Sequence, residues 1–412
     1  MTIRPTPASA AAARRSGPVS VHESLSGAAD ALAALLETLS AAFEAGVEHV
    51  HVEPSDPHQS SEPAVTPWRL RFRHGDGLEE YRLPADHALP EALARLSADE
   101  PSFTVSLGGQ RQLVEIATRE TTRGPSHLLT LHGNALAPRR LDEFGLDPRH
   151  LQALRARLSA DGGGWLPVGS RSAVDGASLV RALAQELTSP ERALLCLESG
   201  PHPPLPRVTQ IDIASGLPTP LALDTDAVLL AASPPDAVLG TLAARAAEGL
   251  LVVQRTLARR ASDPLARLLA LGLAPAWLAL NVPAVLMRYR VRLLCPHCRM
   301  RDREEEPRGL TGASHDPGIV DVAAWLESSL AARYRRGGGC ERCRGSGHVG
   351  VRDLTEIVTP DEETRAALLS GDVSTALARV DASSDLVSRL PALVASGEIA
   401  AEEATRLLMP RA

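Results

Sequence analysis

Lysine is absent from this sequence of 412 residues, so all 43 of its basic side chains are arginine. A GC-rich genome explains such a bias at surface positions. For chemistry the consequence is specific, because no residue of this chain can act as the phosphate-binding lysine of a P-loop.

Aromatic residues are also scarce, at 3% of the sequence, so the cores must consist mainly of leucine, valine and alanine. No run of about 20 apolar residues occurs, and we therefore expect no membrane span. The net charge of -7 gives no overall basic footprint, and the short Arg259-Arg260 and Arg335-Arg336 clusters lack interleaved aromatic residues. We therefore expect no nucleic-acid partner.

Cysteine occurs five times, and four of the five form two C-x-x-C pairs, Cys295/Cys298 and Cys340/Cys343, with 41 residues between them. Two such turns can present four thiolates to one tetrahedral ion and leave no position open for water. We therefore predict a structural Zn²⁺ site in a reducing compartment. The competing interpretation, four reduced cysteines in a core, fits less well because charged residues flank both pairs. Cys196 lies in an apolar run and is interpreted as a core residue.

The stretch 162–181 has the layout of a phosphate-binding loop, with a short apolar strand, Gly169, a run of small residues and a helical pattern from about Ala177. Its chemistry departs from the G-x-x-x-x-G-K-[ST] pattern. Counted from Gly169, the lysine falls on Asp175 and the Ser/Thr on Gly176. A carboxylate at the lysine position would repel a polyphosphate.

The rest of the chain predicts an α/β protein with several domains, since apolar runs alternate with helical patterns after residue 148. Residues 276–287 are interpreted as a further buried helix. The predicted parts are a disordered tail (1–25), an N-terminal α+β domain (26–132), a linker (133–147), an α/β domain (148–290), a tetracysteine module (291–352) and a helical region (353–412). We expect no signal peptide in the tail.

Several motifs, in this order, resemble the secretion ATPase family that drives type II secretion and type IV pilus assembly. The resemblance covers about residues 27–409, and its most specific part is the cysteine module. The motifs are His51-Val-Glu53-Pro54, Arg71-Phe-Arg73 before Asp76-Gly77, Arg292-Leu-Leu-Cys295-Pro-His-Cys298, Gly339-Cys-Glu-Arg-Cys-Arg-Gly-Ser-Gly347, and residues 393–404.

This resemblance implies a PAS-like N-terminal domain, a RecA-like P-loop core, a zinc-bearing C-terminal module and hexameric assembly. It also implies ATP and Mg²⁺ as ligands and an inner-membrane platform protein as a partner. The expected location is cytoplasmic, with peripheral association at the inner membrane.

The same resemblance indicates where catalysis should lie, and those positions have changed. The Walker B glutamate is replaced by Ala232, and both histidines of the family's histidine box are leucine, at Leu250 and Leu257. With Asp175 and Gly176, these are the degenerate catalytic positions. The family's acidic box retains one carboxylate here, that of Glu198. The residues assigned to a vestigial nucleotide site are Gly169, Ser170, Arg171, Ser172, Ser178 and Glu198.

We therefore expect a catalytically inactive family member that is a scaffold or regulatory subunit. It would form homo-hexamers, or hetero-hexamers with a catalytic ATPase. One alternative is an unconventional or weakly ATP-binding enzyme in which Arg171 or Arg181 replaces the lysine and Glu198 or Asp226 serves the metal. Arginine is a poor substitute for the compact charge of lysine. A second alternative is a zinc-based adaptor or chaperone, because the second cysteine pair resembles the zinc repeat of J-domain chaperones.

Overall fold

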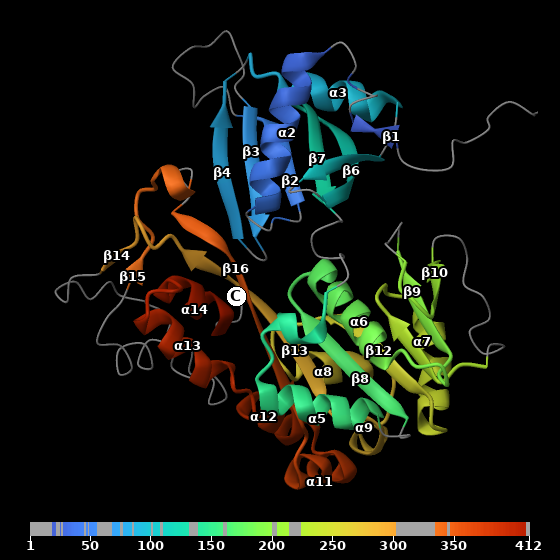
Figure 1. Cartoon of the computed structure of the whole chain (residues 1–412). Coiled ribbons are helices and arrows are strands. Elements are labelled where there is room, and N and C mark those ends of the chain that lie inside the picture. Colours follow the sequence, from blue (N-terminus) through green and yellow to red (C-terminus); the bar gives the residue numbers. More distant parts are fainter. Residues whose placement is uncertain are drawn as a thin grey trace, which may run out of the picture. The chain divides into compact units, whose positions relative to one another are not determined.

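The computed structural model describes residues 19–21, 25, 28–44, 47, 49–55, 68–74, 77–84, 86–99, 102–107, 110–131, 139–159, 163–199, 204–213, 224–301, 334–343 and 347–408. The chain divides into two compact units, residues 1–134 and 135–412 (Figure 1). Among the described residues, no helix combines the length and apolarity needed to cross a bilayer.

The first unit is a seven-stranded sheet in the order β1-β5-β6-β7-β2-β3-β4, with helices α2 (Ala29–Glu44) and α3 (Leu89–Asp99) packed on one face. Alternation along β2 explains this arrangement, because Val50 and Val52 are buried in the core while His51 and Glu53 lie on the opposite face. The strands are β1 (Val19–Ser20), β2 (His49–Pro54), β3 (Trp68–His74), β4 (Gly77–Leu83), β5 (Ser102–Leu107), β6 (Gln110–Thr121) and β7 (Gly124–Leu131).

The expectation of a disordered tail over residues 1–25 is wrong for its last part. Val19 and Ser20 form β1, which pairs in parallel with β5, and Val21 and Leu25 are buried in the same core. These apolar side chains gain more from burial than a free tail would allow. Residues 1–18 lie outside the described residues, and a PAS-like fold for this unit stays a prediction.

The second unit has an α/β core, as expected from the alternation in the sequence. Its seven-stranded sheet has the order β10-β9-β11-β12-β8-β13-β16, and every neighbouring pair is parallel except β13 and β16. The strands are β8 (Gly164–Ser170), β9 (Leu194–Glu198), β10 (Val208–Asp212), β11 (Ala227–Leu230), β12 (Leu251–Leu257), β13 (Val285–Leu294) and β16 (His348–Val358).

Helices cover both faces of this sheet, and each face has its own apolar cluster. One cluster joins the sheet to the short helix η2 (Leu141–Phe144), to α5 (Pro148–Ser159) and to α6 (Ala173–Leu187). The other joins it to α7 (Asp236–Ala247), α8 (Asp263–Ala270), α9 (Pro275–Asn281), α11 (Glu362–Ser370), α12 (Val373–Ala382), α13 (Leu386–Ala395) and α14 (Ala401–Leu408).

Several predicted boundaries differ from the structure. The helix expected over 276–287 ends at Asn281, because Pro283 disfavours helix in the residue before it, and β13 follows. The boundaries at 290/291 and 352/353 cut through β13 and β16, which pair from Val285↔Val358 to Leu294↔His348. The predicted linker 133–147 contains η2, whose Leu141 and Phe144 are buried in the core. The first and last residues of the predicted cysteine module, 291–294 and 348–352, therefore belong to strands of the core sheet.

Candidate functional site

The turn between β8 and α6 is the position that the sequence assigns to a phosphate loop. A Cβ at Gly169 would lie 2.3 Å from Sδ of Met287 and 2.9 Å from Cβ of Ala258, so any side chain there would require these neighbours to shift. The helix begins at Ala173, one turn before the predicted start, because the Ser172 hydroxyl caps it by accepting from the Asp175 N–H at 3.3 Å. Only two residues therefore separate the strand from the helix.

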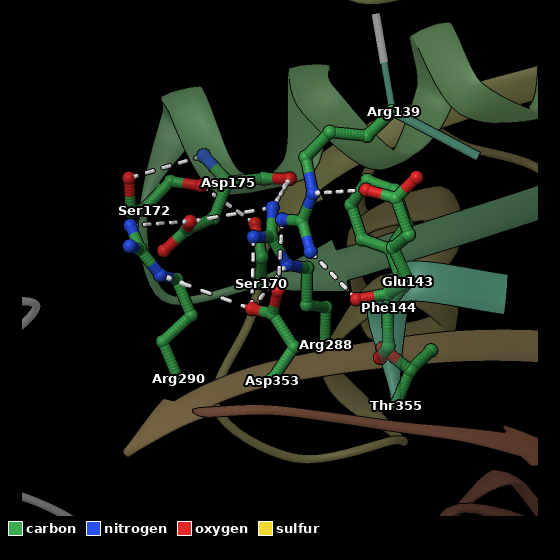
Figure 2. A network of polar contacts seen from close by, with 10 residues as sticks. All are labelled: Arg139, Glu143, Phe144, Ser170, Ser172, Asp175, Arg288, Arg290, Asp353 and Thr355. Atoms are coloured by element: carbon green, nitrogen blue, oxygen red, sulfur yellow. Dashed lines mark hydrogen bonds and ion pairs between the residues drawn. The ribbon is translucent and has the colours of Figure 1, made fainter. Parts of the chain in front are cut away.

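Asp175 lies in the first turn of α6 and is only 7% exposed. Its Oδ1 is 3.0 Å from Nη1 of Arg290 and 3.3 Å from Nη1 of Arg288. Arg288 also donates to the main-chain carbonyl of Asp175 at 2.5 Å. Figure 2 shows both guanidinium groups, which come from β13, directed at this residue. The side chain at the lysine position is thus an anion held by two arginines.

A second carboxylate extends this network across β16 (Figure 2). Asp353 accepts from Nε and Nη2 of Arg288 at 3.0 and 2.9 Å, and its other oxygen is 2.8 Å from Nη1 of Arg139. The Arg139 and Arg288 guanidinium groups lie 4.2 and 4.7 Å from the centroid of the Phe144 ring. Burial alone would raise the pKa of the Asp353 carboxyl, but the three arginines lower it below its usual value.

Arg171, the basic residue of the turn itself, contacts the last helix of the chain. Its Nη1 and Nη2 donate to the carbonyls of Arg406 and Leu407, at 3.1 and 2.7 Å, near the carboxyl end of α14. Guanidinium groups suit such unpaired carbonyls because they complement the negative end of the helix dipole. The side chain that could have met a phosphate therefore caps α14.

Glu198, the retained carboxylate of the acidic box, forms a buried ion pair with Arg181 of α6. Gln210 of β10 donates to its other oxygen at 2.8 Å. Burial raises the pKa of the neighbouring Cys196 thiol well above its usual value. The two groups named as substitutes for the lysine and the metal ligand are thus partners of one another.

The remaining positions predicted for the site lie at opposite ends of the parallel strands. Ala232 follows β11, where its N–H donates to the Leu197 carbonyl at 2.9 Å, and Leu257 ends β12 with 63% of its surface exposed. Leu250 and Asp226 precede β12 and β11 and line a groove at the amino ends of the strands. Asp226 accepts from the Ala193 N–H at 2.7 Å. Glu198 ends β9, which is parallel to β11, so Asp226 and Glu198 lie at opposite edges of the sheet. Ligands of such sheets bind at the carboxyl ends, where Glu198 lies.

The four cysteines of the two C-x-x-C pairs come together where β13 ends and β16 begins. Their sulfur atoms all lie within 4.8 Å of one another, and three pairs, Cys295–Cys340, Cys298–Cys343 and Cys340–Cys343, are 3.7 Å apart. Tetrahedral zinc with Zn–S bonds of about 2.3 Å requires sulfur separations of about 3.8 Å. The donor set and its spacing fit this ion.

Local hydrogen bonds support a thiolate at Cys343 of this cluster. Burial opposes ionisation of Cys343, but the backbone N–H groups of Cys340 and Gly347 donate to its sulfur at 3.1 and 3.2 Å and lower its pKa to about 6. At Cys298, burial and the neighbouring thiols raise the pKa to about 12. His297 is 2.6 Å from Nη1 of Arg342 through its Nε2.

The proteins that this chain resembles include secretion and pilus assembly proteins. The sequence model of the family described as "Type II/IV secretion system protein" matches residues 212–406. The type IV pilus assembly ATPase PilB of Thermus thermophilus is 24% identical over 324 residues, which are 76% of this chain and 33% of that protein. Type II secretion system protein E of Klebsiella pneumoniae is 22% identical over 355 residues, 81% of this chain and 66% of that protein.

The chain thus spans between a third and two thirds of the length of these curated relatives. Among solved structures, the ATPase DotB of Legionella pneumophila superposes with a TM-score of 0.53 at 14% sequence identity. That match covers 90% of this chain and 94% of the DotB chain. At this identity the likeness concerns the fold alone.

Proposed function

We propose that this chain, which belongs to the type II/IV secretion system protein family, is a member without ATP hydrolysis that serves as a scaffold or regulatory subunit of a secretion or pilus machine. The observation that carries the proposal is Asp175, an anion paired with Arg288 and Arg290 at the position of the phosphate-binding lysine. A γ-phosphate would have to displace that carboxylate from both arginines.

The other catalytic positions support the same proposal. Ala232 and Leu257 offer neither a carboxylate to orient water nor an imidazole. Each such group contributes a few kcal/mol of transition-state stabilisation, so the combined loss would cost many decades in rate. Ala232 is buried and keeps the packing at the end of β11, whereas Leu257 is exposed, and neither side chain offers the lost chemistry.

The contacts of Arg171, Arg181 and Glu198 count against an unconventional ATPase. Arg171 caps α14, and Arg181 and Glu198 pair with each other. Asp226, the other carboxylate considered for the metal, is at the amino ends of the strands. A zinc adaptor unrelated to ATPases is also disfavoured, because the described residues between 163 and 257 form the parallel strands of an α/β core.

For the cysteine cluster we propose a structural Zn²⁺ held by Cys295, Cys298, Cys340 and Cys343. The ion would join the end of β13 to the start of β16, and with four thiolate ligands it would take no part in a reaction. Its role would be to fix the geometry of the module next to α13 and α14.

The domain folds, the oligomeric state and the partners are inferred from the family and are part of this proposal. We propose a RecA-like core, supported by the parallel sheet with helices on both faces, and a PAS-like first unit. The chain would form hexamers, alone or with a catalytic ATPase, and would meet an inner-membrane platform protein from the cytoplasmic side. Any residual affinity for ATP and Mg²⁺ would be weak.

Phosphate release from Mg²⁺-ATP tests the proposal on the purified full chain. The expected rate equals that of the Arg171→Ala variant and of a sample lacking Mg²⁺. Mg²⁺-dependent turnover that disappears in Arg171→Ala would overturn it. Recovery of a catalytic secretion ATPase with the tagged chain from its native cell would support the scaffold role.

A further inference from the structure

We propose that the Asp175 carboxylate is a built-in anion that takes the place of a phosphate, so that the loop is permanently occupied by the chain itself. The inference rests on the proposed function in one respect, that the site no longer receives nucleotide. It adds what fills the site instead, and it predicts a latent inorganic-phosphate site beneath that carboxylate.

The surroundings of Asp175 have the chemistry of an anion site. The residue lies in the first turn of the 15-residue helix α6, where the helix dipole favours negative charge. Arg288, which is only 2% exposed, reaches it from the sheet, and Arg290 approaches from the next position on the same face of β13. Paired guanidinium groups at a helix start bind phosphate as readily as carboxylate.

The charges show that the carboxylate is needed for balance. Arg139, Arg288 and Arg290 contribute three positive charges to the network, and Asp175, Asp353 and the half-exposed Glu143, 3.6 Å from Nε of Arg139, contribute three negative ones. Without Asp175, three guanidinium groups would face two carboxylates. The network would then carry one surplus positive charge in a largely buried position, which is unfavourable, so the emptied position would attract an anion from solution.

The packing of the turn explains why the native chain would not admit a free phosphate. A Cβ at Gly176 would lie 2.7 Å from Cγ of Arg255 and from Oγ of Ser170, so the helix start is closely packed on that side. On the outer side Arg171 is engaged with the α14 carbonyls. The Asp175 side chain therefore fills the space in which a phosphate would have to sit.

Thermal denaturation of the full chain in inorganic phosphate, against chloride at equal pH and ionic strength, tests this inference. In Asp175→Ala the Tm should rise by roughly 2–3 °C at a phosphate concentration about ten times its Kd. In the unmodified chain the same titration should move Tm by less than about 1 °C. Isothermal titration with phosphate and with pyrophosphate should detect binding in the variant alone.

Asp236→Ala is the matched control. Asp236 also lies in the first turn of a helix, α7, and pairs with an arginine, Arg267, at 2.8 Å, but both side chains are exposed. Its removal should give no phosphate response. Asp175→Asn provides a variant of nearly unchanged shape, and it should respond to phosphate in the same direction as Asp175→Ala.

The outcomes are separable. If both Asp175 variants melt cooperatively and neither responds to phosphate, the inference is overturned, and phosphate binding of equal strength in the unmodified chain overturns it too. If Asp175→Ala unfolds in chloride, recovery of a cooperative transition in phosphate supports the inference, and failure of both variants to respond contradicts it. ATP turnover by the unmodified chain would sink the proposed function without bearing on this measurement, which contains no nucleotide.

Discussion

Strand β13 supplies the arginines that contact the phosphate-loop position and ends at the cysteine cluster, and the two regions differ in what the chain has retained. At the cluster the four thiol groups converge at the spacing that a tetrahedral ion needs. At the loop, the partners of Arg288, Arg171 and Arg181 all belong to the chain itself. One region presents a set of four donors that fits a tetrahedral ion, and in the other the charged side chains form internal contacts.

The difference indicates which of the two features the fold depends on. Removal of the proposed zinc would leave four cysteines without a common partner at the junction of β13 and β16. At the loop a carboxylate and a salt-bridge network already fill the space, so under the proposed function the fold needs no nucleotide there. A chain with this arrangement can keep its fold without a bound nucleotide.

The largest effect is expected from Cys343→Ser. A weaker ligand in a tetrahedral thiolate site should release the metal, and structural zinc sites stabilise small modules by about 10 kcal/mol or more. Metal analysis should find about one zinc ion per unmodified chain and almost none in the variant. Hydrogen exchange should accelerate in β13 and β16 near Leu294 and His348, which pair beside the cluster.

Cys196→Ala is the control for this measurement, because Cys196 is buried in β9 away from the other four cysteines. It should keep its zinc. A metal-free native protein, or full zinc content in Cys343→Ser, would show that the cluster is not the donor set described here.

A smaller but still severe effect is expected from Asp353→Ala. The substitution leaves Arg288 and Arg139 without their shared carboxylate in a largely buried position. Removing one partner of a buried pair costs about 3–5 kcal/mol, whereas Asp236→Ala, which breaks an exposed pair, should cost less than about 1 kcal/mol. Urea denaturation would compare the two, and equal losses would contradict the view that the network holds the loop.

Acid should weaken the same network, and so lower the stability of the fold, without any substitution. The folded-state pKa of Asp353 is lowered by its arginines, so its contribution is fully present above the unfolded value of about 3.9. That contribution is lost as the pH falls through the folded pKa. Asp353→Asn should remove this part of the acid dependence, and an unchanged stability profile below about pH 4 would argue against the ion pairs.

The sequence predicts the cysteine cluster far better than the loop, for a physical reason. Metal ligands are identified by residue type and short spacing, as in Cys295/Cys298 and Cys340/Cys343. The partners of Asp175 are 113 and 115 residues away, on a strand whose first residues were interpreted as helix. Had β13 been recognised, the alternation Arg288-x-Arg290-x-Arg292 would have predicted one charged face.

The alternation of elements was sufficient to predict the α/β core, but element ends were less certain. The pattern Ser172-x-x-Asp175 carries a helix start that the prediction set one turn too late. Leu250 and Asp226 precede their strands in the sequence, so their place at the amino ends could have been inferred. Which side chain Arg171 would contact could not, because α14 lies 235 residues further along the chain.

The smallest effect is expected where the resemblance predicts catalysis most directly, in Leu257→His. The residue is 63% exposed at the carboxyl end of β12, so exchanging it for histidine should change the free energy of unfolding by less than about 0.5 kcal/mol. ATP turnover should remain absent, because Asp175 still occupies the loop and Ala232 still offers no carboxylate. Measured turnover in this variant would mean that the loop admits nucleotide after all, and the contrast with the cysteine cluster would fail at that point.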